Sequence, residues 1–443
     1  MSPRSYFAAH AWLPDGAQED VRIETSDGRI TSVQAGAQSQ REDFPLPGLT
    51  LPGFANTHSH AFHRALRGRT HDGGGTFWTW RERMFAVASR LDPDTYHALA
   101  RATFAEMALA GISSVGEFHY LHHAPDGRPY RDANAMGLAV IAAAAEAGVR
   151  LTLLDACYVA GGLGPDGALP LRGEQLRFGD GDAQRWAARV AALSDTPSVR
   201  IGAAIHSVRA VPREQLSTVV AAATGRALHV HVSEQPAENE QSLSAYGRTP
   251  TELLGEAGAL GPLTTAVHAT HLTDTDVAAL GAAGTYISMC PTTERDLADG
   301  VGPARRLREA GSTLTLGSDQ HAVIDLLEEA RALEMGERLV SLRRGCFAPA
   351  ELVAALTCDG QRSIGWPDAG RLEVGARADF TAVRLDSVRT AGSRPEQAVF
   401  TASASDVDTV VVDGRMIVQG GRHMLGDIGT MLAAAIEALV RVA

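Results

Sequence analysis

A repeated alternation of short apolar strands with helical segments constrains the fold of this chain more than any other feature. Eight strand-like runs are rich in β-branched residues, and segments with helical periodicity, such as 93–110, 133–147 and 212–223, separate them. The runs are 51–56, 112–120, 149–158, 199–208, 227–234, 265–270, 285–291 and 313–318. This alternation predicts a closed parallel (β/α)8 TIM barrel. An open doubly wound sheet is the alternative, but no Gly-x-Gly-x-x-Gly follows the first strand.

Two further strand-rich segments lie at opposite ends of the chain. In each, two short strands flank an Asp-Gly pair, Asp27-Gly28 and Asp413-Gly414, which is a signal for a tight hairpin turn. Neither segment is large enough to form its own core, so we expect both to combine into one discontinuous β-sandwich. The predicted organisation is a β-sandwich from 1–52 and 366–423, a barrel from 53–365, and a C-terminal helix from 424–443.

Composition narrows the class of protein further. The chain is 45% hydrophobic and 21% charged, its N-terminus has no leader pattern, and its four cysteines are scattered, which favours a reduced, cytoplasmic protein. A net charge of −12 argues against nucleic acid or an anionic membrane as the main partner. All 40 basic residues are arginine. A lysine Schiff base and a carboxylated lysine that bridges two metals are therefore excluded.

Histidine and aspartate side chains recur where the predicted strands end. His58 and His60 end the first strand, His231 lies near the end of the fifth, His268 lies in the sixth, and Asp319 follows the eighth. The C-terminal ends of barrel strands form the active site of such folds, and side chains two apart on a strand point to the same face. We therefore expect these groups to converge.

Three of these histidines and the aspartate are suited to one zinc ion. We predict that His58, His60, His231 and Asp319 bind a single Zn2+, with Fe2+ as an alternative ion. His229 has the same periodicity as His231, but His231 lies nearer the strand end. An isolated His-x-His pair is more often structural, so the prediction depends on the downstream groups.

The same constellation predicts a hydrolytic mechanism. Zinc lowers the pKa of a bound water to about 7, and the resulting hydroxide would attack an electrophilic carbon. Asp319 would accept the proton of the water, His268 would polarise the reacting centre, and Glu234 would carry a proton to a leaving nitrogen. On its own, His268 would equally be a core histidine.

These residues resemble the amidohydrolase superfamily, and within it the cytosolic aminohydrolases with one zinc. A finer resemblance is to the formimidoylglutamate deiminases of histidine degradation. It is carried by His58-Ser59-His60-Ala61-Phe62, by Phe77-Trp78-Thr79-Trp80-Arg81-Glu82, by the run from Glu117 to His123, and by His206-Ser207-Val208-Arg209. The resemblance implies a homodimer that converts N-formimino-L-glutamate and water to N-formyl-L-glutamate and ammonia.

A substrate with two carboxylates needs fork-shaped donors, which arginine provides. The resemblance implies that Arg81, Tyr120, His206 and Arg209 contact the glutamate part of the substrate. His63 stands where the family has a glutamine that contacts the substrate. A histidine can donate a similar hydrogen bond, but its charge depends on pH.

Two other functions are weighed against this one. The first is deamination of a purine, a nucleoside or a guanidino compound, which would need aromatic stacking and base-edge donors instead of arginines. The second is an inactive barrel that serves as an assembly protein. The complete set of ligands at four strand ends argues against an inactive barrel, because such a protein has no need of them.

Overall fold

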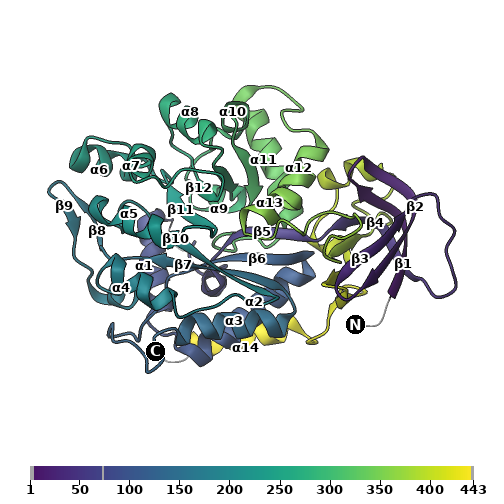
Figure 1. Ribbon diagram of the computed structural model, residues 1–443, viewed down its shortest axis with the longest axis horizontal. Helices are drawn as coiled ribbons and strands as arrows, with labels where there is room; N and C mark the ends of the chain where they lie inside the picture. Colours follow the sequence, from purple (N-terminus) through teal and green to yellow (C-terminus); the bar gives the residue numbers. More distant parts are fainter. Residues whose placement is uncertain (1–3, 72–73, 441–443) are drawn as a thin grey trace.

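The computed structural model describes residues 4–71 and 74–440, and a parallel barrel forms its larger part (Figure 1). Its strands are β5 (Phe54–Ser59), β6 (Ile112–His119), β7 (Arg150–Cys157), β10 (Val199–Ile205), β11 (Leu228–Val232), β12 (Thr264–His268), β13 (Tyr286–Met289) and β14 (Thr313–Leu316). They follow one another in chain order and pair in parallel. The predicted (β/α)8 barrel is confirmed, with strand ends within a few residues of the predicted ones.

The ring of strands is completed where β14 meets β5. The Asp319 amide donates to the His58 carbonyl oxygen at 2.9 Å, and the His60 amide donates to the Asp319 carbonyl oxygen at 3.1 Å. A Cβ atom at Gly317 would lie only 2.7 Å from the Cβ of His58. Only glycine therefore allows the two strands to approach here, and the closure places Asp319 directly against both histidines.

Helices surround the barrel and connect its strands. They are α1 (Phe77–Ala88), α2 (Pro93–Leu109), α3 (Ala135–Ala147), α4 (Ala183–Val190), α5 (Arg213–Ala222), α6 (Pro236–Tyr246), α7 (Pro250–Glu256), α8 (Asp274–Ala282), α9 (Pro291–Asp296), α10 (Ala304–Ala310), α11 (Leu326–Ser341), α12 (Pro349–Leu356) and α13 (Cys358–Ser363). Short 3-10 segments are η1 (Ala61–Leu66), η2 (Gly173–Phe178), η3 (Pro395–Phe400) and η4 (Ala404–Asp406), and β8 (Gly162–Gly164) with β9 (Gly167–Leu169) forms a hairpin. The start of α2 shows how the local sequence fixes where a helix begins. The Asp92 carboxylate accepts a hydrogen bond from the Thr95 amide, and Pro93 takes the first helical position.

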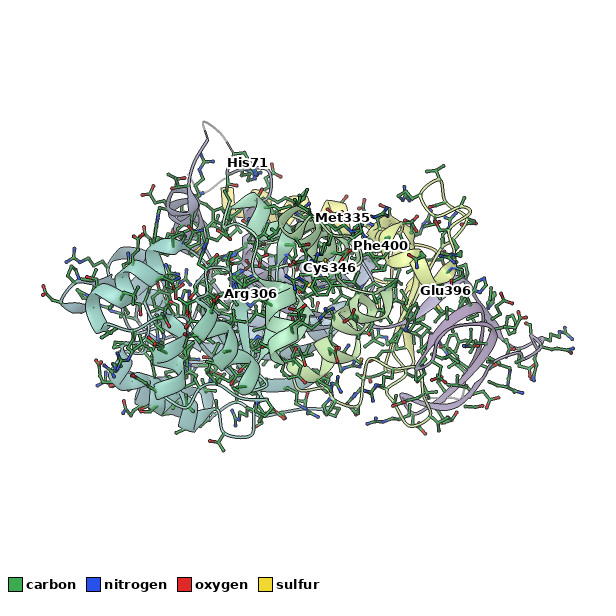
Figure 2. All side chains as sticks on the ribbon, turned by 90° about the horizontal axis from the view of Figure 1, so that it is seen from above. His71, Arg306, Met335, Cys346, Glu396 and Phe400 are labelled. Carbon is green, nitrogen blue, oxygen red and sulfur yellow. The ribbon has the colours of Figure 1, made fainter. Side chains whose placement is uncertain are left out.

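The two ends of the chain form a second sheet beside the barrel, as seen from the front in Figure 1 and from above in Figure 2. Its strands are β1 (Arg4–Leu13), β2 (Gly16–Ser26), β3 (Arg29–Gln34), β4 (Phe44–Pro52), β15 (Phe380–Val383), β16 (Val407–Val412), β17 (Arg415–Gln419) and β18 (Arg422–His423). Pairing of β4 with β15 joins the two ends. The expected sandwich forms as one continuous eight-stranded sheet. The sheet bends back on itself, so that the Ala378 amide, just before β15, donates to the Gly28 carbonyl oxygen in the turn between β2 and β3.

Both predicted hairpin turns are present. Asp27 and Gly28 have φ angles of 49° and 78°, and Asp413 and Gly414 have φ angles of 48° and 73°. Positive φ at both central residues is the geometry that Asp-Gly favours in two-residue hairpins. The bent sheet encloses its own apolar core, in which the rings of Tyr6 and Phe380 meet edge to face at 4.8 Å.

A buried arginine joins the end sheet to the barrel. Arg150, at the start of β7, donates to Asp379 Oδ1 at 2.9 Å and to Ser114 Oγ at 2.9 Å. The C-terminal helix predicted over 424–443 is α14 (Ile428–Val440), which packs beneath α2, and residues 441–443 lie outside the described part. The domain limits given above stay a prediction. No helix in the described ranges is long and apolar enough to cross a membrane.

Candidate active site

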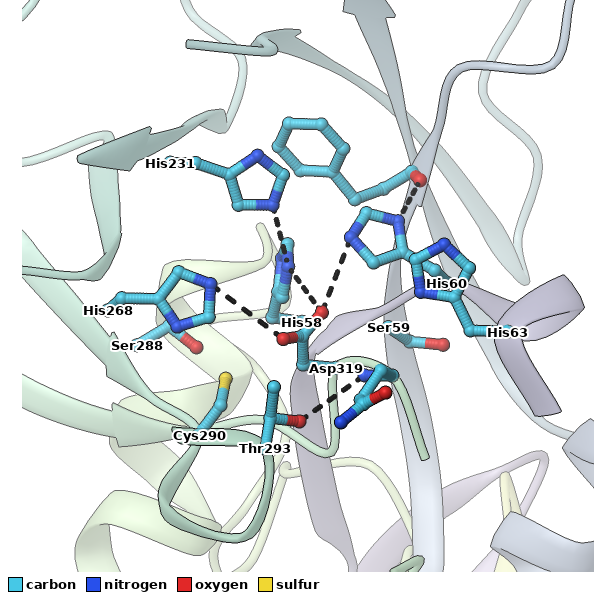
Figure 3. A network of polar contacts seen from close by, with 12 residues as sticks. His58, Ser59, His60, His63, His231, His268, Ser288, Cys290, Thr293 and Asp319 are labelled. Carbon is cyan, nitrogen blue, oxygen red and sulfur yellow. Dashed lines mark hydrogen bonds and ion pairs between the residues drawn. The ribbon is translucent and has the colours of Figure 1, made fainter. Parts of the chain in front are cut away.

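The predicted ligands meet at the C-terminal end of the barrel (Figure 3). His58 and His60 come from the end of β5, His231 from β11, His268 from the end of β12, and Asp319 from the residues after β14. All five side chains are buried. His268 and Asp319 have φ angles of 66° and 42°, a left-handed conformation that costs free energy and that tends to occur where function requires it.

The separations between donor atoms fit one tetrahedral metal ion. His231 Nε2 lies 3.1 Å from His58 Nε2, and Asp319 Oδ1 lies 3.4 Å from both His58 Nε2 and His60 Nε2. Zinc–nitrogen bonds of about 2.0–2.1 Å in a tetrahedron place neighbouring donor atoms about 3.3 Å apart. These three separations match this value, and His58, His60 and Asp319 form one group whose donor atoms all lie within 4.8 Å of one another, with His231 beside His58.

Backbone carbonyl groups orient two of the imidazoles toward this centre. His60 Nδ1 lies 2.9 Å from the Phe118 carbonyl oxygen, and His231 Nδ1 lies 2.8 Å from the His206 carbonyl oxygen. A carbonyl oxygen only accepts, so each Nδ1 carries the hydrogen and each Nε2 keeps its lone pair for a metal. Burial lowers the pKa of His58, His60 and His231, and neutral imidazole is the form that binds metals.

The groups that would move protons lie beside this donor set. His268 Nε2 is 3.7 Å from Glu234 Oε1 and 3.7 Å from Asp319 Oδ2. Burial opposes charge on His268, but Glu234, Glu294 and Asp319 outweigh it and raise the pKa of His268 to about 10. Burial raises the pKa of Glu234 to about 7. Burial would also raise the pKa of Asp319, but the neighbouring imidazoles hold it below its usual value.

Two carboxylates that support the site were not predicted from the sequence. Glu294 Oε1 lies 3.4 Å from His268 Nδ1 and accepts the Cys290 amide at 2.9 Å, so it holds the imidazole from behind. Glu117 accepts from Ser59 Oγ at 2.5 Å and from the Ala61 amide at 2.6 Å, on either side of His60. Glu117 lies in β6, two residues before the strand ends, which was a signal available in the sequence, whereas Glu294 lies in α9 and only the fold brings it to His268.

A cavity of about 240 Å³ opens from the candidate metal ligands toward α1 and the β8–β9 hairpin. All five predicted substrate contacts line it: His63, Arg81, Tyr120, His206 and Arg209. His63 lies on η1, and its Nε2 is 2.8 Å from the Tyr120 hydroxyl oxygen. The cavity therefore brings together residues from η1, from α1 and from the segments that follow β6 and β10, but the substrate contacts themselves stay a prediction.

The two arginines have no carboxylate within 4 Å among the described residues. The Arg81 guanidinium lies 5.7 Å from the Trp78 ring and 5.0 Å from the Phe85 ring. The Arg209 guanidinium lies 6.0 Å from the same Trp78 ring, and Arg209 Nε is buried without a hydrogen-bond partner in the described ranges. Two cations in one cavity of an acidic protein thus have aromatic faces beside them and are suited to bind an anion.

A second group of buried donors lies apart from this centre. Atoms of His119, His122 and Asp155 lie within 4.8 Å of one another. Arg189 donates to both oxygens of Asp155 at 2.8 and 2.9 Å, and Trp186 Nε1 donates to it at 2.9 Å. Because the carboxylate is already neutralised by a buried cation, this group is a structural ion pair with neutral histidines beside it.

The fold and the site together define a barrel enzyme with a candidate metal centre. The amidohydrolase family matches residues 49–417, and the N-terminal domain of formimidoylglutamate deiminases matches residues 4–45. The chain belongs to the amidohydrolase family. It is therefore a hydrolase that cleaves C–N bonds.

Individual relatives narrow the comparison. The chain is 35% identical to a formimidoylglutamate deiminase of Pseudomonas aeruginosa, over 94% of this chain and 95% of that protein. It is 29% identical to an 8-oxoguanine deaminase of the same organism, over 94% of each chain. Among solved structures, an amidohydrolase from Brucella melitensis superposes with a TM-score of 0.91 at 32% identity, covering 99% of this chain and 100% of that one.

Proposed function

We propose that this protein is a zinc-dependent deiminase that converts N-formimino-L-glutamate and water to N-formyl-L-glutamate and ammonia. The observation that carries the proposal is the pair Arg81 and Arg209, which face the metal ligands across one cavity without a carboxylate partner among the described residues. A substrate with two carboxylates would provide one anionic partner for each of these arginines. The similarity to a formimidoylglutamate deiminase over nearly the whole chain supports the same substrate.

The proposed ligands are His58, His60, His231 and Asp319, whose donor atoms have the separations given above. When bound, zinc would supply a Lewis acid and a water molecule with a lowered pKa. Asp319 takes the proton of the attacking water, because its second oxygen, Oδ2, faces His268 and not the other ligands. The neighbouring imidazoles that lower its pKa keep Asp319 ionised and ready to accept.

His268 and Glu234 complete the proton transfers. A positively charged His268 donates through Nε2 to the oxygen that becomes negative at the reacting carbon, while Glu294 holds its Nδ1. Asp319 returns the first proton of the water to the imino nitrogen, and Glu234, with a pKa of about 7, takes up the second proton of the water and delivers it to the same nitrogen, which then leaves as ammonia. The formimino C–N bond breaks, and the carbonyl of N-formyl-L-glutamate forms.

The rest of the cavity binds the glutamate part. Arg81 and Arg209 bind one carboxylate each, and Tyr120, His206 and His63 add hydrogen bonds. His63 Nδ1, Trp80 Nε1 and Arg209 Nε all lie buried around the cavity without partners in the described part of the chain. Buried polar atoms are rarely left unpaired, so these three atoms support a polar ligand in this place. A homodimer and a role in histidine degradation belong to the same proposal.

A screen of ammonia release tests the proposal. N-formimino-L-glutamate is expected to be the preferred substrate, with guanine, 8-oxoguanine, adenosine and N-carbamoyl-L-glutamate as competitors. The purine compounds are included because of the 8-oxoguanine deaminase among the relatives. A purine has no carboxylates for the two arginines. Faster release of ammonia from any purine than from N-formimino-L-glutamate would overturn the proposal.

Metal content provides the first specific prediction. The purified protein is expected to hold about one zinc ion per chain by elemental analysis, and chelation is expected to abolish activity. His231→Asn should lose the zinc, because it removes one of four ligands. His229→Asn is the matched control two residues earlier on β11, and it should keep the zinc, since His229 Nε2 faces the Ser363 carbonyl oxygen. Two zinc ions per chain, or the reverse result for the two variants, would contradict the assignment.

Glu234→Gln provides the second prediction. Loss of the proton carrier is expected to lower kcat about 10²- to 10⁴-fold with little change in zinc content or KM. Glu234 must be ionised before it can take up a proton. Wild-type kcat/KM should therefore fall as the pH drops below about 7, where the Glu234 carboxylate becomes protonated. The variant should lack this acid limb. Glu240→Gln, exposed on helix α6 just after Glu234 in the chain, is the control and should behave as wild type.

A further inference from the structure

Tyr158 directly follows β7 and lines the cavity beside Arg81. The residue is only 3% exposed, and its ring lies 4.4 Å from the His206 ring and 5.2 Å from the Phe178 ring, measured between centroids. These contacts fix the direction of the hydroxyl group.

The hydrogen bonds at the Tyr158 hydroxyl oxygen come only from donors. Arg81 Nη2 donates to it at 3.1 Å, and Gln175 Nε2 donates to it at 3.3 Å. A guanidinium has no acceptor, so the direction of the first bond is certain. The direction of the second bond depends on which way the Gln175 amide faces.

The surroundings of Gln175 settle the orientation of its amide. Gln175 Nε2 donates to the Gly161 carbonyl oxygen at 2.9 Å, and Gln175 Oε1 accepts the Arg172 amide at 3.2 Å. Exchanging the two atoms would place oxygen against a carbonyl oxygen and nitrogen against an N–H group. Gly161 also has no room for a Cβ atom, which would lie 2.4 Å from the Pro170 carbonyl oxygen, so the loop is held in this position.

Both partners of the Tyr158 hydroxyl oxygen are therefore pure donors. A phenol carries one hydrogen of its own, and this hydrogen has no acceptor among the described residues. The Tyr120 hydroxyl differs, because His63 Nε2 and Met84 Sδ both lie within reach and both can accept. A buried O–H group without an acceptor costs free energy, which a ligand in the cavity would recover.

We propose that Tyr158 is a further substrate-binding residue, whose hydroxyl donates its hydrogen to the carboxylate that Arg81 binds. That this carboxylate belongs to N-formimino-L-glutamate rests on the proposed function. Its position beside Tyr158 rests on the contact between Arg81 and the Tyr158 hydroxyl oxygen. Arg81 and Tyr158 form one two-donor subsite, and Gln175 holds the hydroxyl so that its hydrogen faces the cavity. Tyr158 thereby determines specificity for one of the two carboxylates of the substrate.

Binding of three formyl compounds to Tyr158→Phe tests the proposal. N-formyl-L-glutamate carries both carboxylates, N-formyl-L-norvaline keeps only the α-carboxylate, and 4-formamidobutanoate keeps only the side-chain carboxylate. Loss of one hydrogen bond to a charged group is expected to weaken N-formyl-L-glutamate about tenfold to a hundredfold by calorimetry. One of the two mono-acids should weaken by a similar factor, and the other should bind as to wild type.

The controls separate a lost hydrogen bond from a disturbed fold. Tyr246→Phe, at the end of α6 and outside the cavity, should bind all three compounds as wild type does. Zinc content and Tm of Tyr158→Phe should match those of wild type. Unchanged affinity for N-formyl-L-glutamate would overturn the proposal, and so would an equal loss for both mono-acids, because a structural role predicts no selectivity.

The binding experiment is independent of turnover. If wild type releases no ammonia from N-formimino-L-glutamate but Tyr158→Phe weakens only one mono-acid, the proposed reaction fails and the carboxylate subsite stands. If wild type turns over N-formimino-L-glutamate and Tyr158→Phe matches it in binding and kcat/KM, the reaction stands and the role of Tyr158 fails.

Discussion

Asp319→Asn is expected to lower the rate of ammonia release at least about 10³-fold while the barrel stays folded. The amide has the shape of the carboxylate but cannot accept a proton, and its nitrogen would place N–H groups against a ligand imidazole or the metal. The backbone bonds between Asp319 and the two histidines of β5 do not involve the side chain. The circular dichroism spectrum and Tm should therefore change little.

Zinc content of the same variant distinguishes the two roles of Asp319. Full zinc with no turnover means that Asp319 acts mainly as the proton acceptor, whereas loss of zinc means that it acts mainly as a ligand. Asp274→Asn is the matched control, because Asp274 is 95% exposed at the start of α8 and forms a surface ion pair with Arg306. Turnover of Asp319→Asn near the wild-type rate would remove Asp319 from the proton transfer.

The convergence of the candidate metal ligands could be predicted from the sequence because its signals are local. His58 and His60 lie two apart on one strand, and the barrel rule places all strand ends at one face. The choice of His231 over His229 needed only the position along β11. In the structure His231 lies 3.1 Å from His58, whereas His229 faces Ser363.

The long-range features could not be predicted in the same way. Pairing of β4 with β15 joins residues more than 300 positions apart, and no periodicity specifies that register. For the same reason the sequence does not show that the two end segments pair into one continuous sheet, which bends back over its own core. Glu294 and Gln175 lie in a helix and a 3-10 segment, and only the folded chain shows that they hold His268 and Tyr158.

The sequence alone was least informative about the surroundings of Arg81 and Arg209. By sequence, Arg81 belongs to a segment rich in Trp, Arg and Glu, which is typical of a surface ion pair. In the structure Glu82 is not its partner; the guanidinium instead lies beside Trp78 and donates to Tyr158. The same Trp78 ring lies beside Arg209, so one aromatic side chain at the cavity mouth contacts both cations. Both guanidinium groups therefore lie in one cavity and not on an open charged surface.

Arg209→Met is expected to lower kcat/KM for N-formimino-L-glutamate about 10²- to 10³-fold, because an unpaired buried carboxylate costs about 3–4 kcal/mol. Methionine keeps the length and apolar stem of the side chain, so the cavity should keep its shape. N-formiminoglycine lacks the side-chain carboxylate and should lose less than about fivefold on the same change. The measurement is the initial rate of ammonia release from each compound in wild type and variant.

Arg213→Met is the matched control for this effect, since Arg213 lies four residues further along, exposed on α5, and pairs with Glu256 outside the cavity. It should change neither substrate. The ratio of the two losses in Arg209→Met carries the argument, because distortion of the barrel would lower both rates together. Equal losses on both substrates would mean that Arg209 does not bind the side-chain carboxylate. That carboxylate would then lie with Arg81 and Tyr158.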